Sequence, residues 1–179
     1  MFAPEIWQYG IVAQTRRVVT LEAEQMRIRR SMISGCVAVG LALGAAAGVQ
    51  AQAPRVVAIT GTDAMKYSVA AITAKPGEKL TIKLTGQGAI PKVAMAHNFV
   101  LLALKTDATA FATAAANARA TDFVPADKKA DVLASTKLAG NGETVEVTFD
   151  APKVPGVYDF ICTFPGHFIA GMKGTLTVK

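Results

Sequence analysis

Residues 156–178 read GVYDFICTFPGHFIAGMKGTLTV, and this stretch decides how the rest of the chain is interpreted. Both of its ends are rich in β-branched and aromatic residues, which is typical of strands. Between them, Cys162, His167 and Met172 follow one another at intervals of five residues. Pro165-Gly166 supplies a bend between the first two. We therefore expect a strand–loop–strand unit whose loop can wrap around one metal ion.

The chain contains few histidines and cysteines. The only histidines are His97 and His167, and the only cysteines are Cys36 and Cys162. A thiolate and two imidazoles form the trigonal ligand set of blue-copper sites, and a methionine thioether adds a long, weak axial contact. His97 stands at the head of a predicted strand, 65 residues before Cys162. The sequence therefore predicts one copper ion held by His97, Cys162, His167 and, more weakly, Met172.

An export leader is predicted before the metal-binding part of the chain. Residues 27–30 hold three arginines, and residues 31–54 carry no charge. Small residues end the uncharged run, so we expect residues 1–51 to be a mis-started segment plus a signal peptide, with Met26 as the true start and cleavage after Ala51. A retained membrane anchor is the alternative, because the uncharged run is long enough to span a bilayer. Either reading predicts a periplasmic or other extracytoplasmic location.

Residues 52–179 are expected to form one domain. They carry a formal charge of about +4, against +6 for the whole chain. Their lysines are scattered, without the basic run or interleaved aromatic residues that nucleic-acid binding requires. Because Cys162 is the only cysteine left after cleavage, it cannot form an internal disulfide, and a free thiol in an oxidising compartment needs a function. We expect a monomer.

Most of the domain has the pattern of short strands separated by Gly and Pro turns. The Ala-rich residues 107–120 lack Gly and Pro, which predicts a helical insertion there, within a partly helical segment at 105–130. This arrangement predicts an all-β fold, an antiparallel β-sandwich with one helical insertion. The expected strands are residues 55–60, 69–74, 80–84, 97–102, 135–138, 144–149, 156–161 and 174–178.

The segments around the predicted ligands resemble a known family. CTFPGH at 162–167, MKGTLT at 172–177 and MAHNFVL at 95–101 are similar to the corresponding segments of azurins and auracyanins. The resemblance extends over residues 58–179. It implies the cupredoxin fold, an eight-stranded Greek-key β-sandwich or barrel with copper near one end. It also implies a mononuclear type 1 copper protein that passes single electrons between redox partners.

The same resemblance implies roles for residues beside the ligands. Asn98 is expected to tie the two ligand segments together by bonding to the Cys162–Thr163 region. The backbone N–H groups of Asn98 and Phe164 are expected to point at the Cys162 sulfur, which raises the reduction potential. Ala96 stands where azurins have a glycine whose carbonyl approaches the copper. The carbonyl of Ala96 is therefore a candidate for a further weak axial ligand.

An apolar surface is expected around His167, whose ring edge should reach the solvent because it lies in the loop. Such a patch suits brief docking with redox proteins such as cytochromes or membrane oxidoreductases. Contact with a membrane itself is expected only if the leader is retained. The side chains of the predicted patch are Met95, Phe164, Pro165, Phe168 and Ile169.

The small set of metal-binding residues weighs against enzymatic alternatives. A trinuclear copper oxidase needs paired His-x-His motifs, and the chain has two histidines in all. A binuclear copper centre needs a second cysteine in the loop. A Cys–His hydrolase would leave His97 and Met172 without a role. We therefore predict an electron carrier rather than an enzyme, with a periplasmic copper-binding or delivery protein as the alternative.

Overall fold

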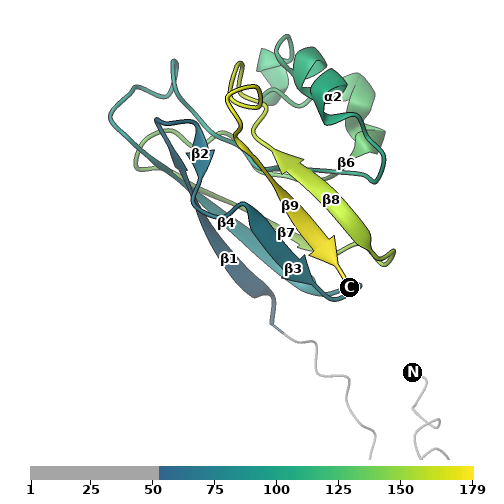
Figure 1. The fold of residues 1–179 in the computed structure, drawn as a ribbon. Helices are drawn as coiled ribbons and strands as arrows, with labels where there is room; N and C mark the ends of the chain where they lie inside the picture. Colours follow the sequence, from purple (N-terminus) through teal and green to yellow (C-terminus); the bar gives the residue numbers. More distant parts are fainter. Residues whose placement is uncertain (1–52) are drawn as a thin grey trace, which may run out of the picture. The chain divides into compact units, whose positions relative to one another are not determined.

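The computed structural model describes residues 53–179, so the predicted leader at 1–51 lies outside the described residues. Within this part of the chain, nine strands and one α-helix are formed (Figure 1). No helix in it is both long and apolar enough to cross a bilayer. The strands are β1 (Arg55–Thr62), β2 (Lys66–Tyr67), β3 (Ala71–Ala74), β4 (Lys79–Gln87), β5 (Val100–Leu102), β6 (Val132–Ser135), β7 (Thr144–Asp150), β8 (Gly156–Ile161) and β9 (Lys173–Val178).

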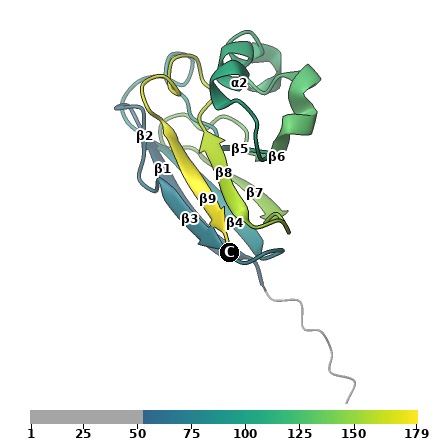
Figure 2. The same cartoon turned by 45° about the vertical axis from the view of Figure 1, so that its right-hand side comes forward.

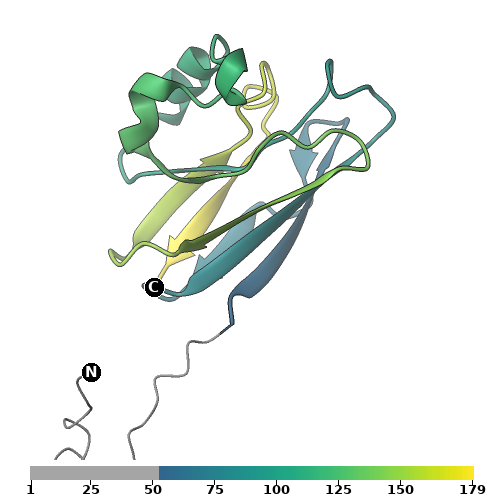
Figure 3. The same cartoon turned by 180° about the vertical axis from the view of Figure 1, so that it is seen from behind.

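The strands build two sheets that share one apolar core. One sheet has the order β2-β1-β4-β7 and the other β3-β9-β8-β5-β6; Figures 1 and 3 show these two layers from opposite sides. The core takes side chains from both sheets, such as Ile82 of β4 and Phe160 of β8, which are fully buried. The predicted all-β sandwich is confirmed.

Alternation of apolar and polar residues explains how β4 and β7 pack. Val145, Val147 and Phe149 of β7 are partly buried against the core, while the residues between them are exposed. The two strands pair in antiparallel register, with Leu84 opposite Val145 and Leu80 opposite Phe149. A period of two places all these apolar side chains on one face.

Two strand pairs are parallel, so the expectation of a purely antiparallel sandwich is wrong. β1 pairs with β4 in parallel register from Arg55 opposite Leu80 onward, and β3 pairs with β9 from Ala71 opposite Thr175 onward. A parallel pair needs a crossover between its strands. Here the chain crosses to the other sheet at β3 and then returns to place β4 beside β1. Apolar alternation does not encode strand direction, which is why this was not predicted.

The strands expected at 97–102 and 135–138 are displaced: β5 begins only at Val100, and β6 ends at Ser135. A side chain interrupts the backbone hydrogen bonds between these two segments, because the Thr136 hydroxyl accepts the Phe99 N–H at 2.9 Å. His97 is joined to the neighbouring segment by a single bridge, in which it exchanges both backbone hydrogen bonds with Ala139, at 2.9 and 2.8 Å. His97 therefore precedes the strand rather than heading it.

The insertion contains a helix, α2 (Ala108–Ala115), that is shorter than the predicted 107–120. The Asp107 carboxylate accepts two backbone N–H groups of its first turn, at 2.9 and 3.0 Å, as an N-cap does. After Ala115 the chain continues in short 3₁₀ turns, at Arg119–Thr121 and Ala126–Asp131. Alanine propensity predicted where the helix lies, whereas its length depends on tertiary packing. Figure 2 shows α2 at the same end of the sandwich as the loop between β8 and β9.

Candidate metal centre

The loop between β8 and β9 is closed by its own backbone. The Cys162 N–H donates to the Met172 carbonyl at 3.1 Å, and the Met172 N–H donates to the His167 carbonyl at 2.9 Å. Gly166 and Gly171 have positive φ angles of 85° and 92°, a conformation that glycine adopts without steric cost. Three of the predicted ligands are thus carried by one short loop that is fixed between two strands.

The structure brings His97, Cys162 and His167 together. One ligand atom from each, an imidazole nitrogen or the thiol sulfur, lies within 4.8 Å of the others. Cys162 Sγ is 3.4 Å from His167 Nδ1, and the ring centroids of the two histidines are 5.1 Å apart. Met172 is fully buried in the same apolar cluster as Cys162. His97, Cys162 and His167 therefore come from two separate segments and meet at one site, and Met172 is buried at the end of the same loop.

One atom of this cluster requires a partner that the protein does not supply. His97 Nδ1 is the one buried side-chain nitrogen or oxygen in residues 53–179 without a hydrogen-bond partner. An unsatisfied buried polar atom costs about 1–3 kcal/mol, so a metal bond to it removes an otherwise unexplained penalty. A set of one thiolate, two imidazoles and one thioether binds copper in preference to harder metal ions, which favour oxygen ligands. The residues therefore fit one copper ion, with His97 Nδ1 as a ligand atom.

Burial sets the protonation states of the ligands. It lowers the pKa of His167 to about 4, with the nearby His97 as a second cause, and it also lowers the pKa of His97. Burial raises the pKa of the Cys162 thiol to about 11. Without metal, both imidazoles are therefore neutral near pH 7 and able to coordinate, while the thiol must lose a proton when it binds.

Three polar groups act on the Cys162 sulfur. Hydrogen bonds from the backbone of Asn98 and the backbone of Phe164 lower the pKa of the thiol, as does the nearby hydroxyl of Tyr67, and all three partly oppose the effect of burial. Donors of this kind stabilise the thiolate form that binds metal. The first two were predicted from the sequence resemblance, and Tyr67 was not.

Asn98 joins the two ligand segments through its side chain. Its Oδ1 accepts the Thr163 backbone N–H at 2.9 Å, and its Nδ2 donates to Thr163 Oγ1 at 2.7 Å and to the Asp122 carbonyl at 2.9 Å. Asn98 and Thr163 are both buried. These bonds hold the residue after His97 against the residue after Cys162. Ala96 is also fully buried, and a contact from its carbonyl to the metal stays a prediction.

Two residues that contact the site were missed in the sequence. Gly61 of β1 lies against the imidazole of His97, because a Cβ at this glycine would be 2.7 Å from the ring Cγ. Tyr67 of β2 is 9% exposed and donates its hydroxyl to the Asn98 carbonyl. A glycine inside a strand is a weak signal of close approach by another group. The sequence around Tyr67 carried no comparable signal.

The predicted surface residues differ in exposure. Ile169 is 87% exposed and Pro165 is exposed, whereas the other three are half-buried. His167 is only 2% exposed, the same as His97. The expectation that the ring edge of His167 reaches the solvent is therefore wrong, because Phe164 packs on it with ring centroids 4.8 Å apart. The half-buried members are Met95, Phe164 and Phe168.

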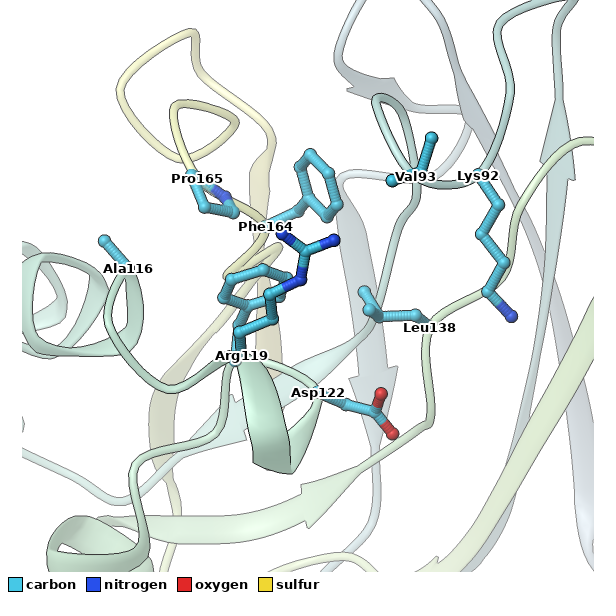
Figure 4. Close-up of a pocket in the computed structure, with 9 residues that line it drawn as sticks. Lys92, Val93, Ala116, Arg119, Asp122, Leu138, Phe164 and Pro165 are labelled. Carbon is cyan, nitrogen blue, oxygen red and sulfur yellow. The ribbon is translucent and has the colours of Figure 1, made fainter.

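A cavity of about 690 Å³ lies beside the metal-binding loop. Figure 4 shows its wall, in which Phe164 and Pro165 of the loop face Arg119 of the helical insertion. On the far side, the cavity is lined by Lys92, whose ammonium group pairs with Glu143 at 2.6 Å. The surface next to the loop is therefore indented and carries both apolar and charged groups.

Comparisons with known proteins agree with this geometry. Residues 54–179 match the family of copper binding proteins described as the plastocyanin/azurin family. Azurin from Pseudomonas denitrificans is 40% identical over 124 residues, which are 68% of this chain and 95% of that protein. Auracyanin-B from Chloroflexus aurantiacus is 51% identical over 83 residues, 46% of this chain and 35% of that protein. Auracyanin A of the same organism, described as a "blue" copper protein, has a solved structure that matches with a TM-score of 0.63 and 33% identity, covering 71% of this chain and 100% of that one. The resemblance seen in the sequence is confirmed.

Proposed function

Because the chain belongs to the plastocyanin/azurin family of copper-binding proteins, we propose that it carries single electrons by means of one copper ion held by His97, Cys162, His167 and Met172. The observation that carries the proposal is the unpartnered Nδ1 of His97 beside a buried thiol and a second imidazole. When bound, the copper ion supplies a one-electron change between Cu(I) and Cu(II).

The contribution of the protein is a ligand set that does not have to rearrange. His97 is held by two backbone hydrogen bonds to Ala139, and the loop is closed by the bonds of Cys162 and Met172. A trigonal set with a weak axial thioether lies between the geometries that the two oxidation states prefer. Little movement is then needed when an electron arrives, which favours fast transfer.

Burial of the ligands supports an electron carrier rather than an enzyme. Cys162 and Met172 are 0% exposed, and the two histidines are 2% exposed. Water and small substrates are therefore kept away from the space between the ligands. A site of this kind can exchange electrons through its surrounding atoms, but it offers no open position for a reacting molecule.

Electrons are proposed to enter and leave at the apolar side of the metal-binding loop. Its exposed Ile169 and Pro165 and its half-buried Phe168 lie within a few residues of His167. A small apolar contact surface permits brief docking and fast release. The partners would be redox proteins such as cytochromes or membrane oxidoreductases.

The proposed location is the periplasm or another extracytoplasmic space. It is supported by the three arginines at 27–30 and the uncharged residues 31–54 that follow them. N-terminal sequencing of the exported protein tests it. A chain that starts at Gln52 is expected, whereas a chain that still contains residues 31–51 would indicate a retained anchor.

Copper loading tests the proposed function directly. Addition of Cu(II) to the metal-free protein is expected to produce an intense blue colour and a reversible one-electron wave in voltammetry. Cys162→Ser is expected to abolish the colour, since an alcohol cannot supply the charge transfer of a thiolate to copper. A variant that stayed blue would refute the assignment of Cys162. A colourless wild-type site that exchanges its metal rapidly would instead indicate copper delivery.

A further inference from the structure

The short strand β2 lies next to the strand that supports His97. Tyr67 of β2 pairs with Gly61 of β1, and Gly61 is the residue that lies against the imidazole of His97. The adjacent Lys66 donates its ammonium group to the Ala170 carbonyl at 2.7 Å, two residues before the Met172 ligand. One two-residue strand therefore contacts both of the segments that carry ligands.

The side chain of Tyr67 is fixed at two points. Its hydroxyl donates to the Asn98 carbonyl at 2.5 Å. Its ring packs on Phe160, with centroids 5.6 Å apart and planes inclined by 55°, and 9% of the residue is exposed. Burial raises the pKa of the phenol well above its ordinary value, so the hydroxyl keeps its proton and remains a donor.

Asn98 connects this hydroxyl to the metal ligands. The residue follows His97 directly, and its backbone N–H is one of the donors to the Cys162 sulfur. Its carbonyl is the group that Tyr67 holds. The N–H and the carbonyl belong to the two peptide groups on either side of the Asn98 Cα, so the Tyr67 bond restrains the Asn98 backbone from its C-terminal side. Hydrogen bonds to a ligating sulfur withdraw electron density from it and tune the reduction potential of a blue-copper site.

We propose that Tyr67 is a positioning residue of the copper centre, which keeps the Asn98 N–H directed at the Cys162 sulfur by holding the carbonyl of the same residue. This inference rests on the proposed function, because its main consequence is a higher reduction potential. A hydrogen bond from the Asn98 N–H reduces donation from the thiolate and thereby disfavours Cu(II). Loss of the hydroxyl should therefore lower the potential.

The chain offers a matched control for this residue. Tyr158 of β8 is 3% exposed and donates its hydroxyl to the Val154 carbonyl at 2.7 Å, at the end of the strand opposite to Cys162. Tyr67→Phe and Tyr158→Phe each remove one buried hydroxyl and one hydrogen bond to a carbonyl. A purely structural effect would therefore be similar in both variants.

The experiment compares these two variants with the wild type in two states. In the copper-loaded proteins, voltammetry and visible absorption should show a lower potential and a displaced blue band for Tyr67→Phe alone. In the metal-free proteins, hydrogen exchange measured by NMR should be several-fold faster at the Asn98 amide for Tyr67→Phe and unchanged for Tyr158→Phe.

The proposal would be overturned if the reduction potential of Tyr67→Phe were equal to that of the wild type or higher. So would equal displacements in both variants, because these would show a general loss of packing. If the wild type did not become blue with copper, the proposed function would fail on its own. The exchange rate of the Asn98 amide in the metal-free protein would still decide whether Tyr67 holds that backbone.

Discussion

Gly61 lies directly against the imidazole of His97. A Cβ at this position would be 2.7 Å from the ring Cγ and 2.8 Å from Cδ2, distances that real side chains do not tolerate. Gly61 cannot retreat easily, because β1 is paired with β4 along its whole length, with Gly61 opposite Gly86. The absence of a side chain at Gly61 therefore helps to set the position of the His97 ring.

Gly61→Ala is accordingly expected to weaken copper binding. The added methyl must displace the His97 ring, and changes in the groups that orient a metal ligand typically lower affinity about 10–100-fold. Competition with a Cu(I) chelator measures the effect. Gly156→Ala is the control, because its new Cβ would meet the flexible end of Leu104 at 3.1 Å and Tyr158 Cε2 at 3.6 Å, an ordinary contact distance. Equal affinities for the two variants would show that the contact with His97 is unimportant.

The ligands could be predicted from the sequence because their chemistry is rare in this chain. Two histidines and one cysteine beyond the leader leave few combinations, and the five-residue intervals among Cys162, His167 and Met172 place three donors on one loop. Most strands could also be predicted, because alternation as in Thr144–Asp150 reports burial of one face. These features are local, and local patterns can be read along the chain.

The remaining features depend on which strands become neighbours. Gly61 contacts His97, and Tyr67 reaches Asn98, only because β1 and β2 come to lie beside a segment that is about 30 residues away in sequence. Likewise, the Thr136 hydroxyl replaces a backbone group in the ladder at Phe99. None of these three contacts leaves a periodic pattern in the sequence, so the start of the strand expected at 97–102 and the groups supporting His97 could not be predicted.

Asn98→Ala is expected to destabilise the metal-free protein by about 2 kcal/mol. The substitution removes three hydrogen bonds of the Asn98 side chain and leaves the buried Thr163 N–H without its acceptor, at a cost of about 1–3 kcal/mol. Chemical denaturation measures the free energy of unfolding. Asn117→Ala, at an exposed position, should change it by less than about 0.5 kcal/mol. A similar small change for Asn98→Ala would mean that this tie contributes little.

Met172→Leu is expected to keep the blue colour and raise the reduction potential. Leucine has a similar volume, so the fold should survive with a loss below about 1.5 kcal/mol. The axial thioether is lost, which disfavours Cu(II). Voltammetry and visible absorption provide the two measurements. Met95→Leu, at a half-buried position near His97, serves as the control and should leave the potential unchanged. A lower potential in Met172→Leu would contradict the axial role.

Ile169→Ser is expected to slow electron exchange with a cytochrome several-fold without changing the potential. Ile169 is 87% exposed on the metal-binding loop, and replacing it with a hydroxyl weakens an apolar contact. Stopped-flow rates should fall by a similar factor at low and high salt, because no charge is altered. The control is Val157→Ser, an apolar residue 59% exposed in β8. If both variants slowed the reaction equally, docking would not be centred on this loop.

Metal binding near pH 7 is expected to release one proton, and that proton comes from Cys162. The thiol has a pKa of about 11 and is protonated in the metal-free protein, whereas His167, with a pKa of about 4, is already neutral. Affinity should therefore rise about tenfold per pH unit between about pH 7 and pH 10, since the bound thiolate competes with one proton in this range. Calorimetry with Zn²⁺, a probe without redox chemistry, in buffers of different ionisation enthalpy counts the protons. Cys162→Ser should release none at neutral pH, and the release of two protons by the wild type would show that an imidazole is charged before the metal binds.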